Sequence, residues 1–387
     1  SEVNVQLEFF EKFLNFEDLS SSNILCYCLN ALNVLAVVLQ QKRPLWIVAN
    51  VAGLSKLLKK CIRSEHQDIQ RSLQKVVGII LRAIVVCKVP LSSEDESPAK
   101  DFVNELVIVI SEDLNGSTTI AAGVMLTWSL FMHCSNKIDS LLPVLMKTFS
   151  KLCSDHLATA QAKDSAAIEE AKITAKFLEH IFYVLSNKIG LLGDSRRPFL
   201  SLIAMLIDRS MDQDFLRQVI RVCRSWTFGT DVFPTAKEKA AILTKMLSFE
   251  LRGEPTLSKD FYSIVLDLFE SKDYLNSEIT IRLEHPFLVG TRISDVETRT
   301  RLMKILNDSL ESDIHERLYY IIRDQNWEYI GEYPWLNQAL QLLFGAFNSY
   351  QQIKLQKGEF TLPTLGSLYD TVNRLDVALP PSTGVIT

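Results

Sequence analysis

Apolar side chains recur every three or four positions along most of the chain, which is the period of an amphipathic α-helix. Leu216, Val219, Ile220 and Cys223 follow this spacing, and the alternation typical of strands occurs almost nowhere. One long pattern predicts a helix over residues 165–187 that carries two adjacent apolar rows. A helix that is covered on two sides is typical of stacked helical layers.

Breaks in the helical pattern divide the chain into short units. The breaks lie near residues 20–22, 90–98, 113–116, 154–163, 190–197, 228–234, 253–255, 271–276 and 290–295. Their spacing of roughly 35 to 45 residues leaves room for two helices per unit, which is the length of a HEAT or armadillo-like repeat. The sequence therefore predicts an all-α solenoid of stacked helix pairs over residues 1–350. The units do not align with one another, so separate helical bundles remain the alternative.

Local signals predict where some elements begin and end. Thr235 and Glu238 have the spacing of a capping box, which predicts a helix that runs from there to about Glu250. Pro143 falls in the first turn of another predicted helix, where a proline costs little. For residues 351–387 the sequence predicts a poorly structured tail or an interhelical loop. This tail ends without a terminal helix, as expected for a fragment of a longer chain.

Composition supports helices and argues against nucleic acid as a partner. The chain has only 14 glycines and 12 prolines in 387 residues, fewer than a β-sandwich or barrel would use in its turns. Its net charge is −5, whereas domains that bind nucleic acid through phosphates carry a basic excess. We therefore expect no direct sequence-specific nucleic-acid binding. Seven cysteines, mostly within apolar runs, are typical of a reducing compartment, the cytosol or the nucleus.

Two uncharged runs are long enough to raise the question of membrane insertion. They cover residues 19–41 and 114–136, and both contain several serine, asparagine or threonine residues. A spanning helix needs about 20 predominantly apolar residues. We therefore predict that both runs are helices buried inside a protein, and that the chain does not bind a membrane.

No pattern of catalytic or metal-binding residues is present. The sequence contains neither a phosphate-binding glycine loop nor a dinucleotide fingerprint, and its six histidines never fall three to five residues apart. Cys26 and Cys28 lie in an apolar helix and point to different faces, unlike a redox pair. Asp155 and His156 resemble an acid–base pair, but no nucleophile accompanies them and we expect both to lie in a solvated loop. We predict no catalytic residue, cofactor, metal or small-molecule ligand.

Two basic rows are the candidate partner-binding residues. The first comprises Lys56, Lys59, Lys60 and Arg63, opposite an apolar row on the same predicted helix. The second comprises Arg217, Arg221 and Arg224. Either row suits an acidic peptide or a phosphate backbone, although each is more typical of the solvated face of an amphipathic helix. A third candidate is aromatic and is more typical of helix packing than of a peptide anchor: Trp327, Tyr329, Tyr333, Trp335, Phe344, Phe347 and Tyr350.

Residues 235–344 carry a more specific pattern. It contains the runs Lys237-Glu238-Lys239-Ala240, Leu283-Glu284-His285-Pro286-Phe287-Leu288-Val289-Gly290-Thr291-Arg292, Glu316-Arg317-Leu318-Tyr319-Tyr320-Ile321-Ile322 and Gln325-Asn326-Trp327-Glu328, and ends with Trp335, Gln338 and Leu340-Gln341-Leu342-Leu343. This stretch resembles the TRRAP/Tra family, the very large transcription-associated members of the phosphatidylinositol-3-kinase-related group. Over residues 1–230 the resemblance rests on helical pattern and order alone.

The resemblance implies a piece of the HEAT-repeat region of a much longer nuclear protein. Members of this family are scaffolds of SAGA-type and related histone acetyltransferase complexes, on which transcription activators dock. Expected partners are therefore the subunits of such a complex and acidic transcription activators. The family's kinase-like domain is catalytically inactive and lies outside this chain, so the resemblance transfers no catalytic residue. Within the shared runs, Pro286 and Gly290 are expected to punctuate helices, and Trp327 and Trp335 to pack.

Two other functions are compatible with a helical array. The first is the regulatory HEAT solenoid of an active kinase of the same superfamily, against which the run Gln325-Asn326-Trp327-Glu328 argues. The second is a general cargo-binding solenoid, which residues 235–344 do not resemble.

Overall fold

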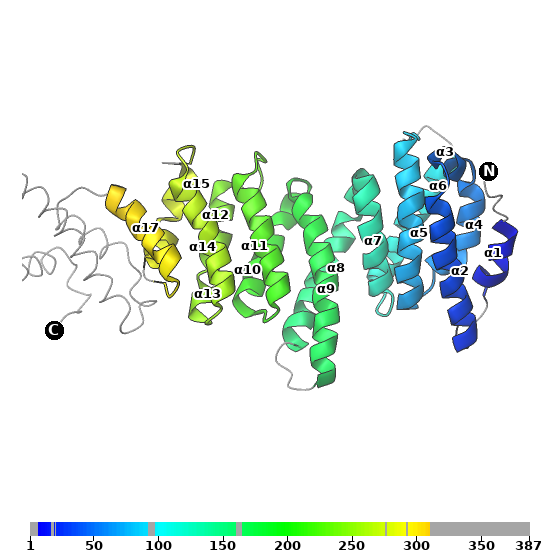
Figure 1. The fold of residues 1–387 in the computed structure, drawn as a ribbon, viewed down its shortest axis with the longest axis horizontal. Helices are drawn as coiled ribbons and strands as arrows, with labels where there is room; N and C mark the ends of the chain where they lie inside the picture. The colour runs from blue at the N-terminus through cyan, green and yellow to red at the C-terminus, as the bar shows by residue number, and fades with distance from the viewer. Residues whose placement is uncertain are drawn as a thin grey trace, which may run out of the picture. The chain divides into compact units, whose positions relative to one another are not determined.

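The computed structural model describes residues 7–16, 19, 21–91, 97–159, 165–274, 277–291 and 293–309. In these ranges the regular structure is entirely helical, and no β-strand occurs. The chain divides into two compact units, residues 1–215 and 216–387. Figure 1 shows the ribbon.

The first unit contains short and long α-helices and three single 3₁₀ segments. Its elements are α1 (Leu7–Leu14), α2 (Ser22–Gln40), α3 (Pro44–Ala49), α4 (Val51–Ile62), α5 (Gln67–Val86), α6 (Pro98–Asn115), α7 (Ile120–Cys134), η1 (Ser135–Leu141), α8 (Leu142–Thr159), α9 (Ser165–Asn187), η2 (Ile189–Leu191), η3 (Gly193–Ser195) and α10 (Arg196–Arg209). Helix α11 (Gln213–Phe228) begins at the boundary of the two units.

The helices of the first unit pack as two layers. In one layer α2 lies against α5, α5 against α7, and α7 against α9; in the other, α4 lies against α6, α6 against α8, and α8 against α10. Consecutive helices such as α4 and α5, α6 and α7, or α8 and α9 join the layers. This is the stacked-pair arrangement of HEAT-type repeats and confirms the predicted all-α solenoid class.

Large apolar side chains fill the space between the layers. Phe149 of α8, Phe182 of α9 and Phe199 of α10 are all fully buried. The ring centroid of Phe199 lies 5.2 Å from that of Phe149 and 6.1 Å from that of Phe182. Aromatic contacts of this kind contribute beyond the area they bury. They tie three successive helices into one core.

The second unit is built around α14. Its helices after α11 are α12 (Ala236–Lys245), α13 (Ser248–Leu251), α14 (Pro255–Glu270), α15 (Glu278–Arg282), α16 (Glu284–Gly290) and α17 (Val296–Ser309). Helix α14 contacts α13, α16 and α17, while α12 contacts α15. Tyr262 and Phe261 of α14 are fully buried, so this helix supplies much of the core of the unit.

The local signals of the sequence are present where predicted, although not every helix end is. The Thr235 hydroxyl accepts a hydrogen bond from the Glu238 amide at 3.3 Å, and the Thr235 amide donates to Glu238 Oε2 at 2.8 Å. This confirms the capping box. The predicted helix to Glu250 is wrong, because α12 ends at Lys245 and α13 is a separate turn. At the interruption the amides of Met246 and Leu247 donate to carbonyl oxygens three residues back, those of Leu243 and Thr244, instead of the four-residue spacing that continues an α-helix.

The positions of α8 and α9 in the chain test the predicted helical pattern further. The prediction of a helix over residues 165–187 is confirmed by α9. Pro143 is the second residue of α8, within the first turn as predicted. The expected break from residue 154 is wrong, since α8 continues to Thr159. His156 is buried on this helix, one turn beyond the buried Leu152 and Cys153, so the core-facing row extends into the stretch that was expected to be a loop.

Several predictions lie outside the described residues. They concern the tail over residues 351–387, the aromatic residues between Trp327 and Tyr350, and the family-specific runs after residue 309. The acidic residues 94–96 also lie outside the described ranges.

Candidate partner-binding surfaces

The first basic row lies on the exposed face of α4. Leu54, Leu57, Leu58 and Ile62 are buried on the opposite face, as the helical period predicts. Lys56, Lys59, Lys60 and Arg63 are all exposed. Lys59 and Lys60 fall in the last turn of α4, where positive charge also stabilises the negative end of the helix dipole. The row is thus both a stabilising feature of the helix and a cationic surface.

Two of the four residues in this row bind neighbouring elements. Lys60 Nζ donates to the carbonyl oxygen of Phe16 at 2.8 Å, and Arg63 pairs with Glu112 of α6 at 3.4 Å. The Arg63–Glu112 pair is half-exposed on both sides, so it contributes at most about 1 kcal/mol. Within the described ranges, neither Lys56 nor Lys59 makes a hydrogen bond or ion pair through its side chain. These two lysines are the part of the row available to a partner.

A carboxyl group beside this row is electrostatically perturbed. Burial, together with the neighbouring charge of Glu112, raises the pKa of Asp113 to about 6, while the charge of Arg63 opposes the shift. Asp113 Oδ2 is buried and receives no hydrogen bond from the described residues. The backbone carbonyl of Asp113 accepts a hydrogen bond from Thr119 Oγ1 at 2.8 Å, which fixes the turn between α6 and α7. The carboxylate is therefore held in place without a compensating donor.

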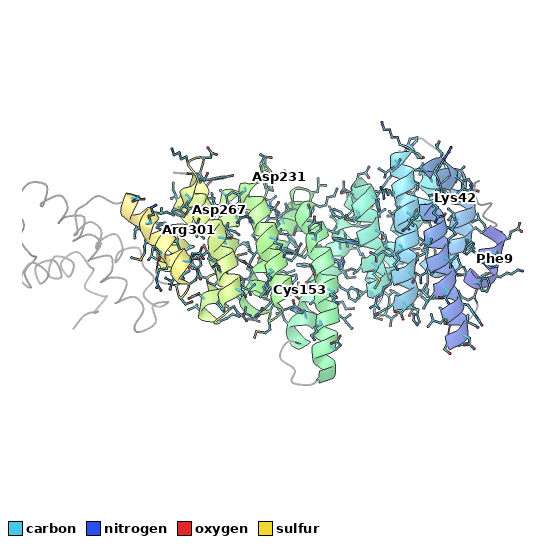
Figure 2. The ribbon with its side chains drawn as sticks, viewed as in Figure 1. Phe9, Lys42, Cys153, Asp231, Asp267 and Arg301 are labelled. Atoms are coloured by element: carbon cyan, nitrogen blue, oxygen red, sulfur yellow. The ribbon has the colours of Figure 1, made fainter. Side chains whose placement is uncertain are left out.

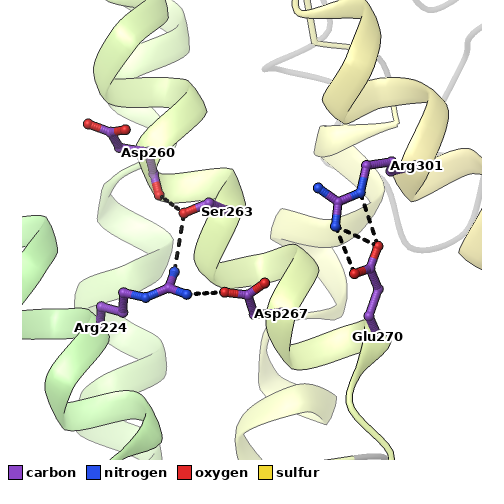
Figure 3. A network of polar contacts seen from close by, with 6 residues as sticks. All are labelled: Arg224, Asp260, Ser263, Asp267, Glu270 and Arg301. Atoms are coloured by element: carbon purple, nitrogen blue, oxygen red, sulfur yellow. Dashed lines mark hydrogen bonds and ion pairs between the residues drawn. The ribbon is translucent and has the colours of Figure 1, made fainter.

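The second basic row lies on α11. Arg221 and Arg224 are exposed, and Arg217 is half-buried. Arg224 pairs with Asp267 of α14, and its guanidinium also donates to Ser263 Oγ at 3.3 Å (Figure 3). The same guanidinium lies 5.3 Å from the centroid of the Phe228 ring. Arg224 therefore ties α11 to α14, which reduces its availability to a partner.

A second arginine extends this connection along α14. Arg301 of α17 donates to both carboxylate oxygens of Glu270, at 2.9 and 2.7 Å from its Nη2 atom (Figure 3). Two-pronged pairs of this kind are more directional than single contacts. The sequence did not single out Arg301, because its partner lies on a helix far away along the chain. Asp267 and Arg301 are also marked on the whole chain in Figure 2.

The predicted acid–base pair at Asp155 and His156 does not lie in a loop. Both residues are in α8, and His156 is only 2% exposed, whereas Asp155 is exposed. His156 Nε2 lies 2.8 Å from the hydroxyl oxygen of Ser210, which is completely buried. A serine–histidine contact can activate a nucleophile only where a substrate reaches it. Here the contact joins α8 to the segment after α10 inside the core.

The sequence itself indicates that His156 faces the core. Phe149, Leu152, Cys153 and His156 follow the i, i+3, i+4, i+7 spacing of one helix face. Extending that row by one turn would have placed the imidazole on the buried side of α8.

The cysteines follow the predicted division into faces. Cys26 is exposed and Cys28 is buried on the same helix, α2. The Cys28 thiol is hydrogen-bonded to that of Cys61 on α4, which lowers the pKa of Cys28 and raises that of Cys61. In the part of the chain that the structure describes, no group of three or more potential ligands could hold a metal ion.

The two uncharged runs differ in how fully they are buried. Helix α2 is long and apolar enough to cross a membrane by length and composition, and one third of its most apolar window is buried. The expectation that it is wholly buried is therefore wrong: Tyr27, Val34 and Val37 are more than half exposed. Phe9 of α1 is exposed at the same end of the unit (Figure 2). Helix α7, in the second run, buries most of its residues.

Similarity to known proteins provides evidence about this chain that its geometry alone does not. The sequence matches the family described as the Tra1 HEAT repeat ring region over residues 1–379. The chain belongs to this Tra1 family. It is 58% identical over 354 residues, 92% of the chain, to the Saccharomyces cerevisiae protein named SAGA complex/NuA4 acetyltransferase complex subunit TRA1.

More distant members of the Tra1 family match nearly the whole chain. The Schizosaccharomyces pombe SAGA complex/NuA4 acetyltransferase complex subunit Tra1 is 27% identical over 95% of the chain. The mouse transformation/transcription domain-associated protein is 24% identical over 97% of it. The chain spans only 10%, 10% and 15% of these three relatives, respectively. It therefore corresponds to a segment of the Tra1 ring.

Proposed function

We propose that this chain is a non-catalytic scaffold segment of a nuclear histone acetyltransferase coactivator complex of the SAGA or NuA4 type. The observation that carries the proposal is the 58% identity, over 92% of the chain, to a named subunit of both complexes. The stacked helix pairs support it, because they expose long rows of side chains on rigid elements. Subunits of the complex are the expected partners.

The proposed role needs no chemistry within the segment. The one serine–histidine contact described, His156 with Ser210, is enclosed in the core and ties elements together. The proposal accordingly includes no cofactor, no small-molecule ligand, no membrane contact and no sequence-specific reading of DNA.

The scaffold proposal is tested on the intact protein purified from its own cells through an affinity tag. We expect histone acetyltransferase subunits and activity to co-purify, and no protein kinase activity above that of an untagged control. Robust phosphorylation without acetyltransferase subunits would instead make this segment the regulatory solenoid of an active kinase.

We further propose that the α4 row contributes to docking of acidic transcription activators. Its support is the pair of exposed lysines, Lys56 and Lys59, whose side chains form no ion pair with a residue that the structure describes. The α11 row is a weaker candidate, because Arg224 is engaged by Asp267.

Charge reversal separates docking from folding at this row. Lys56→Glu combined with Lys59→Glu should weaken capture of an acidic activation segment by about tenfold, since exposed charges mainly govern encounter with a partner. Pull-down from purified complex measures the loss, and helical circular dichroism of the chain should stay unchanged. Lys151→Glu, at an exposed position of α8, is the matched control. Unaltered capture by the double variant would reduce the row to a solvated helix face.

A further inference from the structure

An uncharged helix lies between two charged helices on one face of the first unit. Helix α7 contains no aspartate, glutamate, lysine or arginine, and it packs between α5 and α9 (Figure 1). Its outward row is Ala121, Met125, Trp128 and Met132, at i, i+4, i+7 and i+11. Met132 is 56% exposed and the other three are partly exposed. Three turns of apolar surface, ~16 Å in length, are therefore presented to solvent.

Aromatic rings from α9 widen this row and hold it in place. The Trp128 ring lies 4.7 Å from that of His180 and 5.5 Å from that of Tyr183, measured between centroids. Phe131 lies 6.0 Å from Tyr183 at an interplanar angle of 87°. All four rings are only partly buried. Half-exposed aromatic groups that are already ordered by one another lose little conformational entropy on binding, as interface anchors require.

Exposed cations without ion pairs border the row on both sides. Lys75 and Arg82 are exposed on α5, and Lys176 is exposed on α9. None of the three has a side-chain ion pair with a residue that the structure describes. The nearby cations Arg71 and Lys172 pair instead within their own helices, with Asp68 and Glu169.

Two observations place Arg82 and Lys176 beside the apolar row. A Cβ atom at Gly78 of α5 would lie 3.6 Å from His133 Nε2 on α7, and Arg82 lies one turn after Gly78 on α5. The charge of Arg82 adds to the burial that lowers the pKa of His133. The carbonyl oxygen of Lys176 is 2.6 Å from Nδ1 of His180, the residue whose ring contacts Trp128. Positive charge thus flanks an uncharged strip that contains methionine, tryptophan and tyrosine.

We propose that this α7 surface, formed by Met125, Trp128, Met132 and Tyr183 and flanked by Lys75, Arg82 and Lys176, binds an acidic amphipathic helix of a partner protein. Apolar side chains of the partner at i, i+3, i+4 and i+7 lie on the strip, where methionines adapt to their shape. Carboxylates on either side of that apolar face meet the flanking cations and fix the orientation. The inference rests on the proposed docking function, but it concerns a surface distinct from both basic rows.

The charge pattern favours an acidic helix over a nucleic acid as the occupant of this surface. A nucleic acid needs cations along its whole path, whereas the centre of this strip carries none. An acidic helix satisfies the apolar strip and its borders at once.

The test measures binding of a defined peptide to the intact complex. The probe is a fluorescein-labelled peptide of about 18 residues, roughly five helical turns, with leucine or phenylalanine at every third or fourth position and aspartate or glutamate between them. Lys75→Glu combined with Arg82→Glu should raise its Kd by about tenfold and flatten the salt dependence. Met132→Gln, which changes an exposed side chain and leaves the core intact, should raise the Kd by roughly threefold or more. Lys151→Glu should leave the Kd unchanged.

Other outcomes identify what has failed. Equal affinity of all variants for the peptide would exclude this surface as its site. If a peptide of the same composition without an amphipathic face, or a DNA duplex, bound equally well with the same sensitivity to the double reversal, the surface would be an unspecific cationic patch. A loss confined to the Lys56→Glu, Lys59→Glu variant would overturn this proposal and leave the α4 docking proposal standing. Acetyltransferase activity, assayed in every preparation, tests the scaffold proposal independently.

Discussion

At the scale of single residues, exposure followed from the sequence, while interaction partners did not. The helical period places Lys56 and Lys59 opposite the buried Leu57 and Leu58, as the structure confirms. Whether a lysine is available is decided by residues far along the chain. Lys60 bonds to Phe16, 44 positions away, and Arg224 to Asp267, 43 positions away. No local pattern contains such contacts, because they depend on how the layers stack.

Asp113 yields a prediction about pH. Its folded-state pKa of about 6 lies above the ordinary 3.8, so the folded chain retains the proton to higher pH than the unfolded chain. The free energy of unfolding therefore falls as pH rises from about 4 to about 6 and stays lowered above that range.

Asp113→Asn removes this charge while preserving shape. The substitution should stabilise the chain above pH 6 by about 1 kcal/mol, after allowance for solvent screening, and the gain should fade toward pH 4. Thermal unfolding at several pH values measures it, with the exposed Asp194→Asn as control. A gain that does not depend on pH would show that the carboxylate is not the source of the penalty.

At the scale of elements, helices predicted from local signals were correct, while ends decided by packing were not. The spacing from Thr235 to Glu238 specifies its own cap, and the double apolar row of residues 165–187 fixes α9. The continuation of α8 past residue 154 instead accompanies the burial of His156 against Ser210 in the core. The α7 surface was missed for a similar reason: it requires side chains from α5, α7 and α9 together.

Gly290 shows how closely elements approach in the second unit. This glycine is the last residue of α16, where it was expected to punctuate a helix. A Cβ atom there would lie 2.5 Å from Leu302 Cδ1 and 2.6 Å from Tyr262 Cε1. Both neighbours are fully buried, on α17 and α14, and have little freedom to move. Gly290 is therefore needed for close contact among three helices as well as at a helix end.

Gly290→Ala should destabilise the chain by about 1–3 kcal/mol, because the added methyl group overfills a packed core. Denaturant unfolding of the variant measures the cost. Gly190→Ala provides the matched control, since a Cβ atom at that position meets nothing within 4 Å. Equal stability of the two variants would mean that α16 can shift without loss of packing.

At the scale of the whole molecule, the cysteines report the integrity of both units. Cys26 is exposed and Cys87 is half-buried, while five are buried: Cys28, Cys61, Cys134, Cys153 and Cys223. Cys153, marked in Figure 2, lies in the core of the first unit, and Cys223 in that of the second. Burial raises the pKa of both thiols and so disfavours the reactive thiolate.

Brief alkylation of the folded chain at neutral pH should therefore modify Cys26 first and Cys87 next. The buried thiols should react at least about a hundredfold more slowly, because they need local or global opening. Mass spectrometry of the digested protein measures each site, and full denaturation, after which all seven should react, supplies the reference. In rising denaturant, Cys153 and Cys223 should become reactive as their own units open. Rapid modification of either thiol without denaturant would contradict the packed helical core described for its unit.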